Sequence, residues 1–428
     1  MNISEVAAKM KLDAPLMAAT SCEERNRALR SMGEVISARR DEIFQANRQD
    51  LDRAEADGVP AQVQKRLKFD QGKLDSVLEG IEHLIKLPDP VGKVLLKRQL
   101  DEGLDLYRIT RPIGVIGVIF EARPDALVQI SSLCVKSGNC AILKGGKETR
   151  QTNRALFEAI REALIQADMP EGCLFQATEH GEIDELLSCD EQVDLIIPRG
   201  SNRFVRYIMD HTKIPVMGHA EGICHIYYDQ DADYEKAIPL IVDAKTQYPV
   251  ACNAVETLLV DKAVARDVLP RLQKELESAG ITLRATPEAA ALMEGVQGEL
   301  TEDEMLRTEY GDVILSIALT EGVQGAVSHI NRYGSHHTDC ILTENEETAN
   351  YFFNMVDSAG VYQNCSTRFA DGFRYGLGAE VGISTGKLHA RGPVGLEGLV
   401  TYQYRLIGHG QIVGDYATGR KQFHFKDL

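Results

Sequence analysis

The sequence predicts an α/β protein with two Rossmann-like domains, each built on a parallel sheet, and a small additional β element. Short apolar runs alternate with amphipathic helical stretches between residues 115 and 217, and the alternation starts afresh after residue 218. Buried strands that alternate with helices are typical of parallel β-α-β units. A length of 428 residues exceeds one typical domain, which agrees with a domain boundary near residue 218.

The N-terminal part is predicted to be a helical scaffold. Residues 21–56 are expected to form one long helix, because Ser21 and Glu24 make a capping-box pattern and apolar residues follow at helical spacing. A second amphipathic helix is predicted over residues 74–85, ending before Pro88.

The hairpin pattern in residues 94–111 predicts the additional β element, because two extended segments flank an Asp-Glu-Gly turn. A protruding hairpin would be an oligomer contact, whereas a hairpin folded back on its own domain would not. The pattern leaves both interpretations open.

Both sheets follow from the positions of the apolar runs. Predicted strands of the first sheet are residues 115–120, 140–143, 173–177, 193–197 and 214–217, with helices from residue 125, over 153–167, at 186–187 and over 203–211. Predicted strands of the second sheet are residues 225–229, 256–260, 281–284, 313–318 and 340–343, with a helix over 234–245. Ligands of such sheets bind at the carboxyl ends of the strands.

Composition excludes several classes of protein. The chain has 47 basic and 64 acidic side chains and a net charge of −17, which argues against a nucleic-acid binder. No apolar run spans a bilayer and no signal peptide is evident, so no membrane contact is expected and the cytoplasm is predicted. Nine scattered cysteines without a CxxC pair, and histidines without ligand spacing, predict neither disulfides nor a metal site.

Three short segments carry residues suited to chemistry. Cys252 lies in a loop between a predicted helix and strand, where a thiol nucleophile would be accessible, although its spacing does not distinguish it from an inert cysteine. Gly200 and Ser201 lead from a strand into a helix, which suits either a phosphate site or an ordinary cap. Lys144 and Lys147 flank two glycines at the end of a strand, which suits either a ribose phosphate or a solvated turn.

Strings in the same order along the whole chain resemble the aldehyde dehydrogenase superfamily. They are RPIGVIGVI, CAILKGGKET, DLIIPRGSN, DADYEKAI, TQYPVACNA, TEYGDVIL and VYQN. The more particular strings IFEARPDA, KTQYPVACNAVETLL and FRYGLGAEVGISTGKLHARGPVGLEGL are similar to the members that reduce glutamyl 5-phosphate.

This resemblance implies an aldehyde dehydrogenase-like subunit of three parts. Residues 1–93 and 111–218 would form the dinucleotide-binding domain, and residues 219–397 the catalytic domain. Residues 94–110 and 398–428 would form an oligomerisation element, through which a homo-oligomer would assemble by the hairpin and the C-terminal strand near residues 401–407.

The resemblance also implies roles for individual residues. Cys252 matches the nucleophile, and Lys144 the lysine that meets the adenosine ribose. Ser201, next to Gly200, matches the serine at the cofactor pyrophosphate, and Glu309 the glutamate that holds the nicotinamide ribose.

Three departures from the oxidising members are informative. His219 stands near the position of the glutamate that activates hydrolytic water. Arg123 replaces the oxyanion asparagine, so Arg123 and Asn253 are the expected oxyanion and phosphate residues. Lys147 replaces an acidic residue and would attract a 2′-phosphate, which predicts NADPH as the cofactor.

The implied reaction is the NADPH-dependent reduction of L-glutamyl 5-phosphate to L-glutamate 5-semialdehyde, the second step of proline biosynthesis, through a thioester on Cys252. Glu221 would bind the substrate ammonium and Arg391 its carboxylate, unless they are members of structural ion pairs. A glutamate 5-kinase is the implied partner enzyme. The alternatives are a CoA-acylating aldehyde dehydrogenase and a catalytically idle dinucleotide-binding protein.

Overall fold

The computed structural model describes residues 2–178, 181–299, 301 and 306–428. The chain divides into two compact units. Unit 1 comprises Met1–Met217, Leu377–Gly382 and Val394–Leu428, and unit 2 comprises Gly218–Gly376 and Ile383–Pro393. The first division falls between Met217 and Gly218, and the chain returns to unit 1 at Leu377–Gly382 and at Val394–Leu428.

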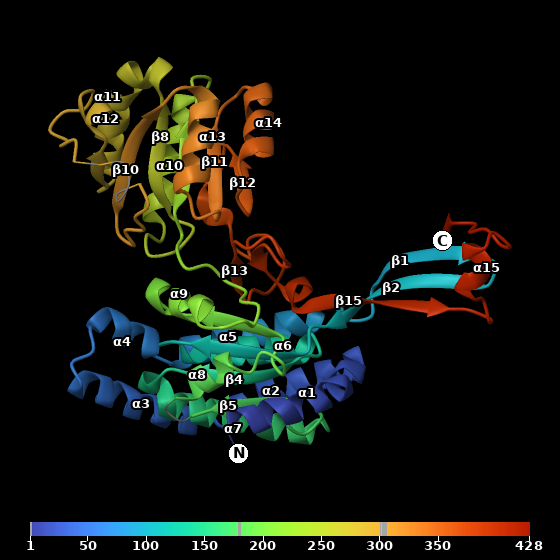
Figure 1. The fold of residues 1–428 in the computed structure, drawn as a ribbon. Coiled ribbons are helices and arrows are strands. Elements are labelled where there is room, and N and C mark those ends of the chain that lie inside the picture. The colour runs from blue at the N-terminus through green and yellow to red at the C-terminus, as the bar shows by residue number, and fades with distance from the viewer. Residues whose placement is uncertain (1, 179–180, 300, 302–305) are drawn as a thin grey trace. The chain divides into compact units, whose positions relative to one another are not determined.

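Unit 1 contains a parallel sheet in the order β5-β4-β3-β6, and helices pack around it (Figure 1). Its strands are β3 (Val115–Phe120), β4 (Cys140–Gly145), β5 (Leu174–Ala177) and β6 (Leu195–Arg199). Every residue of β3 is buried, as expected for a central strand covered on both faces. The strand predicted over residues 214–217 is wrong, because this segment makes only an isolated bridge between Ile196 and Val216. Pro215 has no N–H with which to extend a ladder.

Unit 1 contains helices before its parallel sheet, between the strands of that sheet and after the last of these strands. They are α1 (Ile3–Ala19), α2 (Cys22–Ala38), α3 (Arg40–Ala56), α4 (Ala61–Leu67), α5 (Gln71–Lys86), α6 (Pro124–Lys136), α7 (Arg150–Gln166), α8 (Glu182–Leu187) and α9 (Asn202–Asp210). The capping box of Ser21 and Glu24 is confirmed. The single helix predicted over residues 21–56 is wrong, because the chain breaks at Arg39. Asp41 and Glu42 then occupy the first turn of α3, where acidic residues favour a helix start.

The hairpin predicted over residues 94–111 is confirmed, and it is part of a four-stranded antiparallel sheet in the order β15-β2-β1-β16. Its strands are β1 (Val94–Asp101), β2 (Leu104–Pro112), β15 (Val400–Ile407) and β16 (Lys426–Asp427), with the short helix α15 (Val413–Ala417). We call this sheet the arm, since it extends away from the helices of unit 1 (Figure 1). No helix in the described ranges is long and apolar enough to cross a membrane.

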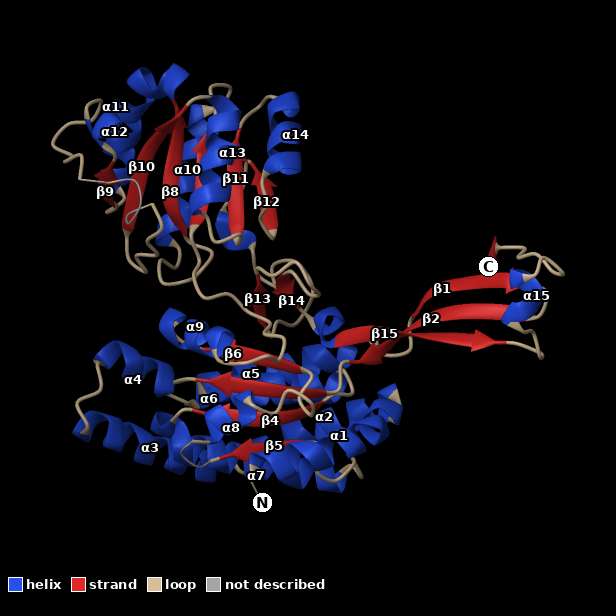
Figure 2. Cartoon of the chain, in the orientation of Figure 1, coloured by secondary structure: helices blue, strands red, loops and turns tan. Residues whose placement is uncertain are grey.

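Unit 2 is a second α/β layer structure, with a parallel sheet in the order β12-β11-β7-β8-β10-β9 (Figure 2). The strands are β7 (Cys224–Tyr228), β8 (Val255–Asp261), β9 (Thr282–Ala285), β10 (Ile314–Thr320), β11 (Thr338–Leu342) and β12 (Gly360–Gln363). Two apolar clusters hold helices against the sheet. One cluster contains residues of α10 (Tyr234–Thr246), α11 (Lys262–Ser278) and α12 (Pro287–Ala290), and the other of α13 (Gly322–Tyr333) and α14 (Glu346–Met355). The predicted α/β class is therefore confirmed.

A buried ion pair fastens both ends of the loop between α10 and β8. The Nζ atom of Lys245 lies 2.7 Å from Oε2 of Glu256, and both side chains are fully buried. Lys245 also donates to the carbonyl of Val255 at 2.9 Å. Burial raises the pKa of the Glu256 carboxyl to about 7, although the charge of Lys245 acts in the opposite direction. The pair therefore holds residues 247–254 between two fixed points.

We expect Lys245→Met to lower the free energy of unfolding of the protein by about 3–5 kcal/mol, because it leaves Glu256 buried without a countercharge. The double variant Lys245→Met/Glu256→Gln should recover much of this loss. Urea unfolding followed by circular dichroism measures both effects.

Lys236→Met is the matched control, because Lys236 pairs with Glu344 at 3.0 Å on the exposed surface of the same unit. That change should cost less than about 1 kcal/mol. Equal losses in the two single variants would contradict the role given to the buried pair.

Candidate active site

Cys252 lies in the loop that the Lys245–Glu256 pair fastens, and its side chain is half-buried. Cys22 and Cys365 are also half-buried, whereas the other six cysteines are buried. Burial raises the pKa of the Cys134 thiol to about 12 and that of Cys173 to about 11. The buried thiols are thus neither accessible nor readily ionised, which leaves Cys252 among three candidates for a nucleophile.

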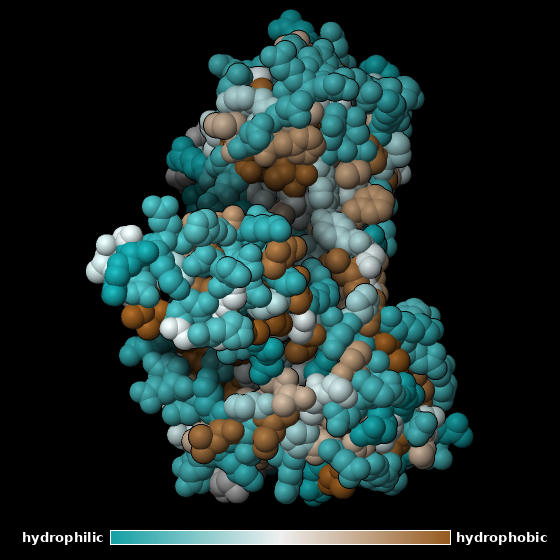
Figure 3. Space-filling view, turned by 90° about the vertical axis from the view of Figure 1, so that its right-hand side faces the viewer, coloured by the Kyte–Doolittle hydropathy of each residue, from teal (hydrophilic) through white to brown (hydrophobic). Residues whose placement is uncertain are grey.

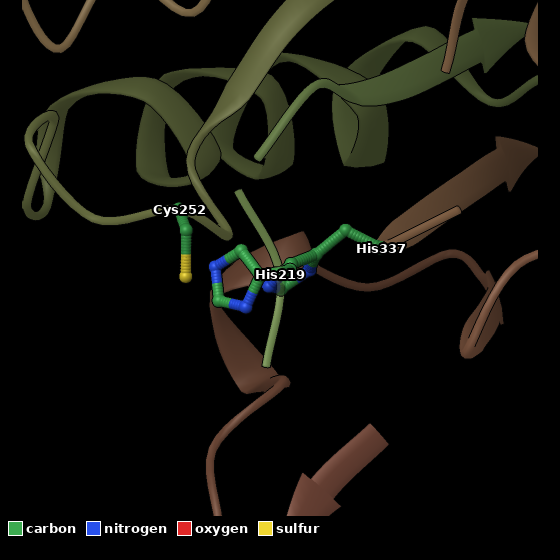
Figure 4. Close-up of side chains that lie close together, drawn as sticks. All are labelled: His219, Cys252 and His337. Carbon is green, nitrogen blue, oxygen red and sulfur yellow. The ribbon is translucent and has the colours of Figure 1, made fainter. Parts of the chain in front are cut away.

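Two histidines of unit 2 lie beside Cys252 (Figure 4). The ligand atoms of Cys252, His219 and His337 all lie within 4.8 Å of one another, and the two rings meet edge to face with centroids 4.8 Å apart. His219 is the residue that the sequence placed near the position of the water-activating glutamate. The cluster formed by these described residues contains two imidazoles and no carboxylate.

Hydrogen bonds fix the orientation of both rings. Nδ1 of His219 lies 2.8 Å from the carbonyl oxygen of Ile383, so it is the protonated nitrogen that donates. Nδ1 of His337 lies 3.0 Å from Oγ1 of Thr338, while its Nε2 is buried without a hydrogen-bond partner in the described part of the chain. The sequence interpreted His337 as structural or substrate-side, and no spacing signal links it to Cys252.

A close backbone contact positions the segment that carries His219. A Cβ atom on Gly222 would lie 2.0 Å from the carbonyl oxygen of Cys252, so only glycine fits here. The N–H of Gly222 donates to Oε2 of Glu309 at 3.1 Å. Glu309, predicted as a cofactor residue, is thereby connected to the nucleophile loop through Gly222.

Asn253 fastens the loop on its other side. Its Nδ2 donates to the carbonyl of Ala370 at 2.8 Å, and its own carbonyl accepts from Oγ1 of Thr367 at 2.7 Å. Nδ2 carries two N–H groups and the bond to Ala370 uses one of them, so both the second N–H and the backbone N–H of Asn253 remain candidates for the predicted oxyanion contact.

Arg368 is a charged residue near the sulfur that the sequence analysis missed. Its side chain is 8% exposed, and its Nε donates to Oε1 of Gln247 at 2.9 Å. Burial lowers the pKa of the Arg368 guanidinium, and the charge of Arg374 adds to this, whereas Cys252 acts in the opposite direction. Arg368 therefore adds a buried positive charge to the electrostatic surroundings of Cys252.

A cavity of about 440 Å³ in unit 1 gathers the predicted lysines. Lys144, Lys147 and Arg150 line it together with glycines 145 and 146 at the end of β4. A Cβ on Gly145 would lie 2.2 Å from Nδ2 of Asn153, so the Asn153 side chain packs directly against the backbone at the end of β4. Three cationic side chains around one cavity match the phosphates of a dinucleotide, and the residues present therefore fit such a cofactor.

The other predicted phosphate residues lie at the start of α9. The N–H and the hydroxyl of Ser201 both donate to Oε2 of Glu121, at 2.9 and 3.2 Å. A Cβ on Gly200 would lie 2.5 Å from the same oxygen. A carboxylate of the chain itself thus occupies the anion position that the sequence assigned to a pyrophosphate.

The remaining predicted site residues are in different surroundings. Arg123 is exposed at the start of α6 in unit 1, whereas Glu221 is half-buried beside His219 in unit 2. Arg391 pairs with Asp357 at 3.1 Å, and Lys387 binds the same carboxylate at 2.6 Å. Arg391 is therefore a member of an ion pair, and a substrate carboxylate would have to compete with Asp357 for it.

Comparison with known proteins identifies relatives over the full length of the chain. Residues 1–293 match the model of the aldehyde dehydrogenase family. Gamma-glutamyl phosphate reductase from Ruminiclostridium cellulolyticum is 51% identical over 423 residues, which are 99% of this chain and 97% of the relative. The protein of the same name from Pelotomaculum thermopropionicum is 52% identical over 428 residues, which are 100% and 98%.

Solved structures agree with these relatives. The crystal structure of gamma-glutamyl phosphate reductase from Thermotoga maritima has a TM-score of 0.93 and 38% identity, and the match covers 95% of this chain and 99% of that one. An acetylating aldehyde dehydrogenase from Geobacillus thermoglucosidasius has a TM-score of 0.63 and 17% identity, with 95% and 96% covered, and shares the fold.

We expect iodoacetamide at neutral pH to label Cys252 faster than any other cysteine of the native protein, because it is only half-buried and the positive charge of Arg368 interacts with it. Peptide mass spectrometry after short exposures measures the order of labelling. Cys365 is the internal reference, since it is also half-buried but its thiol pKa is raised by burial. Labelling of Cys365 at the same rate as Cys252 would show that Cys252 is not activated.

Proposed function

The chain belongs to the aldehyde dehydrogenase family and, within it, to the gamma-glutamyl phosphate reductases, and we propose that it reduces L-glutamyl 5-phosphate to L-glutamate 5-semialdehyde with NADPH. This reaction is the second step of proline biosynthesis. The observation that carries the proposal is the surroundings of Cys252, where two imidazoles and a buried guanidinium lie near an accessible sulfur. A positively charged environment suits a substrate that expels phosphate.

In the first proposed step, the Cys252 thiolate attacks the acyl carbon of the substrate. A carbon–sulfur bond forms, the bond between that carbon and the phosphate oxygen breaks, and phosphate leaves with the electron pair. An imidazole of the cluster accepts the thiol proton beforehand, and the guanidinium of Arg368 stabilises the negative charge that develops. The resulting thioester is the intermediate that splits one difficult reaction into two easier ones.

The absence of a carboxylate from the described cluster supports a thioester that survives until it is reduced. A glutamate at the position of His219 would activate water and hydrolyse the intermediate to glutamate. Nδ1 of His219 is engaged with the carbonyl of Ile383 as a donor, so this nitrogen cannot act as a base toward water.

Lys144, Lys147 and Arg150 are the residues proposed to hold the cofactor phosphates, because they line one cavity. When bound, the reduced nicotinamide would supply hydride to the thioester carbon, and the carbon–sulfur bond would then break, which releases the aldehyde and returns the electron pair to the sulfur of Cys252. Ser201, with Gly200, would bind the pyrophosphate once the Glu121 carboxylate rotates away, and Glu309 would hold the nicotinamide ribose. Lys147 would attract a 2′-phosphate, which favours NADPH over NADH.

The remaining contacts to the substrate and to its phosphate are proposed from the charge and hydrogen-bonding groups of the residues. Arg123 and the backbone of Asn253 would bind the phosphate and the oxyanion. Glu221 would bind the substrate ammonium and Arg391 its carboxylate.

The arm is proposed to join copies of the chain. β15 is an edge strand whose exposed side chains include Tyr402, Tyr404, Leu406 and Ile407. An exposed apolar edge strand favours pairing with another chain. Figure 3 views the molecule from the side toward which the arm points in Figure 1, and apolar groups lie there among polar ones. A glutamate 5-kinase would supply the unstable acyl phosphate, and a thiol nucleophile suits the reducing cytoplasm.

The proposed reaction predicts that glutamate 5-semialdehyde reduces NADP only when inorganic phosphate is present. CoA should not replace phosphate, and other short aldehydes should react poorly. Cys252→Ala should lower the rate by at least about 1,000-fold and leave NADPH binding, measured by fluorescence, nearly unchanged.

Cys365→Ala is the control for this assay and should retain activity. Activity that responds to CoA but not to phosphate would favour the CoA-acylating alternative. Activity retained in Cys252→Ala would exclude the thioester mechanism.

Lys147→Glu should lower kcat/KM for NADPH by about tenfold or more, equivalent to about 1.4 kcal/mol, and change kcat/KM for NADH much less. A carboxylate at this position would repel the 2′-phosphate. Steady-state kinetics with both cofactors measure the ratio. Arg161→Glu is the charge-matched control, because Arg161 is exposed on α7 and pairs with Glu158. A ratio unchanged by Lys147→Glu would mean that another residue selects the cofactor.

A further inference from the structure

The cluster at Cys252 is also a set of ligands for a soft divalent cation. One sulfur and two imidazole nitrogens lie within 4.8 Å of one another. Zinc prefers these ligand types, and a site with three protein ligands keeps its fourth position for water. Bonds of about 2.0–2.3 Å place the ligand atoms of a tetrahedral site roughly 3.3–3.7 Å apart. Side-chain rotations that move the ligand atoms by about 1 Å would therefore bring them to bonding distance from an ion.

The surroundings of His337 point to such a ligand independently. Its side chain is 0% exposed, and its Nε2 is a buried polar atom that no described residue satisfies. In Figure 4 the ring points toward His219 and Cys252. Buried polar atoms normally have a partner, and an ion held by the cluster would supply it.

The other nitrogen of each ring is already held, as in metal sites where a hydrogen bond orients the ligand. Nδ1 of His219 donates to the carbonyl of Ile383, and Nδ1 of His337 contacts the hydroxyl of Thr338. This arrangement makes Nε2 the metal-binding atom in both rings.

The positive charge of Arg368 opposes a second cation at this place. The ligand set offsets this repulsion, because cysteine binds zinc as the thiolate and so brings a negative charge to the ion. Binding exchanges the thiol proton of Cys252 for the ion and releases that proton to solvent. Both histidines bind as neutral imidazoles.

We propose that Cys252, His219 and His337 form a binding site for Zn²⁺, and that the bound ion inhibits the enzyme reversibly by occupying the sulfur. Binding of the ion follows from the ligand set alone and does not depend on the proposed reaction. Inhibition rests on the proposed function, because it requires Cys252 to be the nucleophile.

Titration of the full-length protein with Co²⁺ tests the site without an activity assay. One equivalent should produce a sulfur-to-cobalt charge-transfer band and the visible bands of tetrahedral cobalt, and Zn²⁺ should displace both. Cys252→Ser should abolish the charge-transfer band, and His219→Asn and His337→Asn should each weaken Co²⁺ binding by at least about tenfold. Circular dichroism of each variant establishes that it is folded.

The matched controls are Cys365→Ser and His336→Asn. Cys365 is half-buried in the same unit, and His336 is the neighbour of His337 with a positive φ of 60°, which asparagine tolerates. Both controls should retain the cobalt bands. The proposal would be overturned if the charge-transfer band persists in Cys252→Ser. It would also be overturned if His336→Asn weakens Co²⁺ binding as much as His219→Asn and His337→Asn do.

A second measurement uses the unaltered protein, so it does not depend on the folding of any variant. Zn²⁺ should protect Cys252, and not Cys365, from iodoacetamide, and EDTA should restore labelling. Equal labelling of Cys252 with and without Zn²⁺ would overturn the site. If the ion binds and protects Cys252 but turnover of the proposed substrate continues, the metal site stands, whereas the inhibition and the role of Cys252 as nucleophile fail. If the ion binds but the unaltered protein without Zn²⁺ does not turn over the substrate, the metal site stands and the proposed function fails.

Discussion

The close contact between the backbones of Gly222 and Cys252 is the constraint on which the candidate site depends. Because a Cβ at residue 222 would lie 2.0 Å from the Cys252 carbonyl oxygen, the segment between His219 and β7 can run directly beside the loop that carries Cys252 only with glycine at this position. The loop is fastened at both ends by Lys245 and Glu256 and along its length by Asn253. Backbone contacts and buried polar pairs thus hold the sulfur in position.

The charges near the two predicted binding regions oppose the charge of the whole chain. The chain carries a net charge of −17, yet Lys144, Lys147 and Arg150 line the cavity of unit 1, and Arg368 lies near the sulfur in unit 2. Local charge, and not net charge, decides which ligand a pocket concentrates. An acidic protein can therefore serve two anionic ligands, provided that its basic residues are gathered where those ligands bind.

The fold could be predicted from the sequence more completely than the site. Alternating apolar runs predicted most strands of both sheets, whereas the break at Arg39 was missed, because helical periodicity continues across it and the acidic first turn of α3 was not used as a start signal. Cys252 was identified through resemblance, but His337 and Arg368 were missed as members of its surroundings. Both come from segments far from Cys252 in the chain, and only the parallel order of β7, β8 and β11 brings the segments together. Spacing along a sequence cannot report such neighbours.

The proposed metal site and the proposed chemistry have one physical origin. An acyl-transfer enzyme that must avoid hydrolysis cannot keep a carboxylate at the position of His219, and an imidazole there also has a lone pair that a soft cation can bind. The thiolate that attacks an acyl phosphate is likewise the form of cysteine that binds zinc most strongly. A second imidazole, that of His337, turns two ligands into three. The proposed sensitivity to zinc would thus be the consequence of the proposed protection of a thioester from water by histidine in place of glutamate.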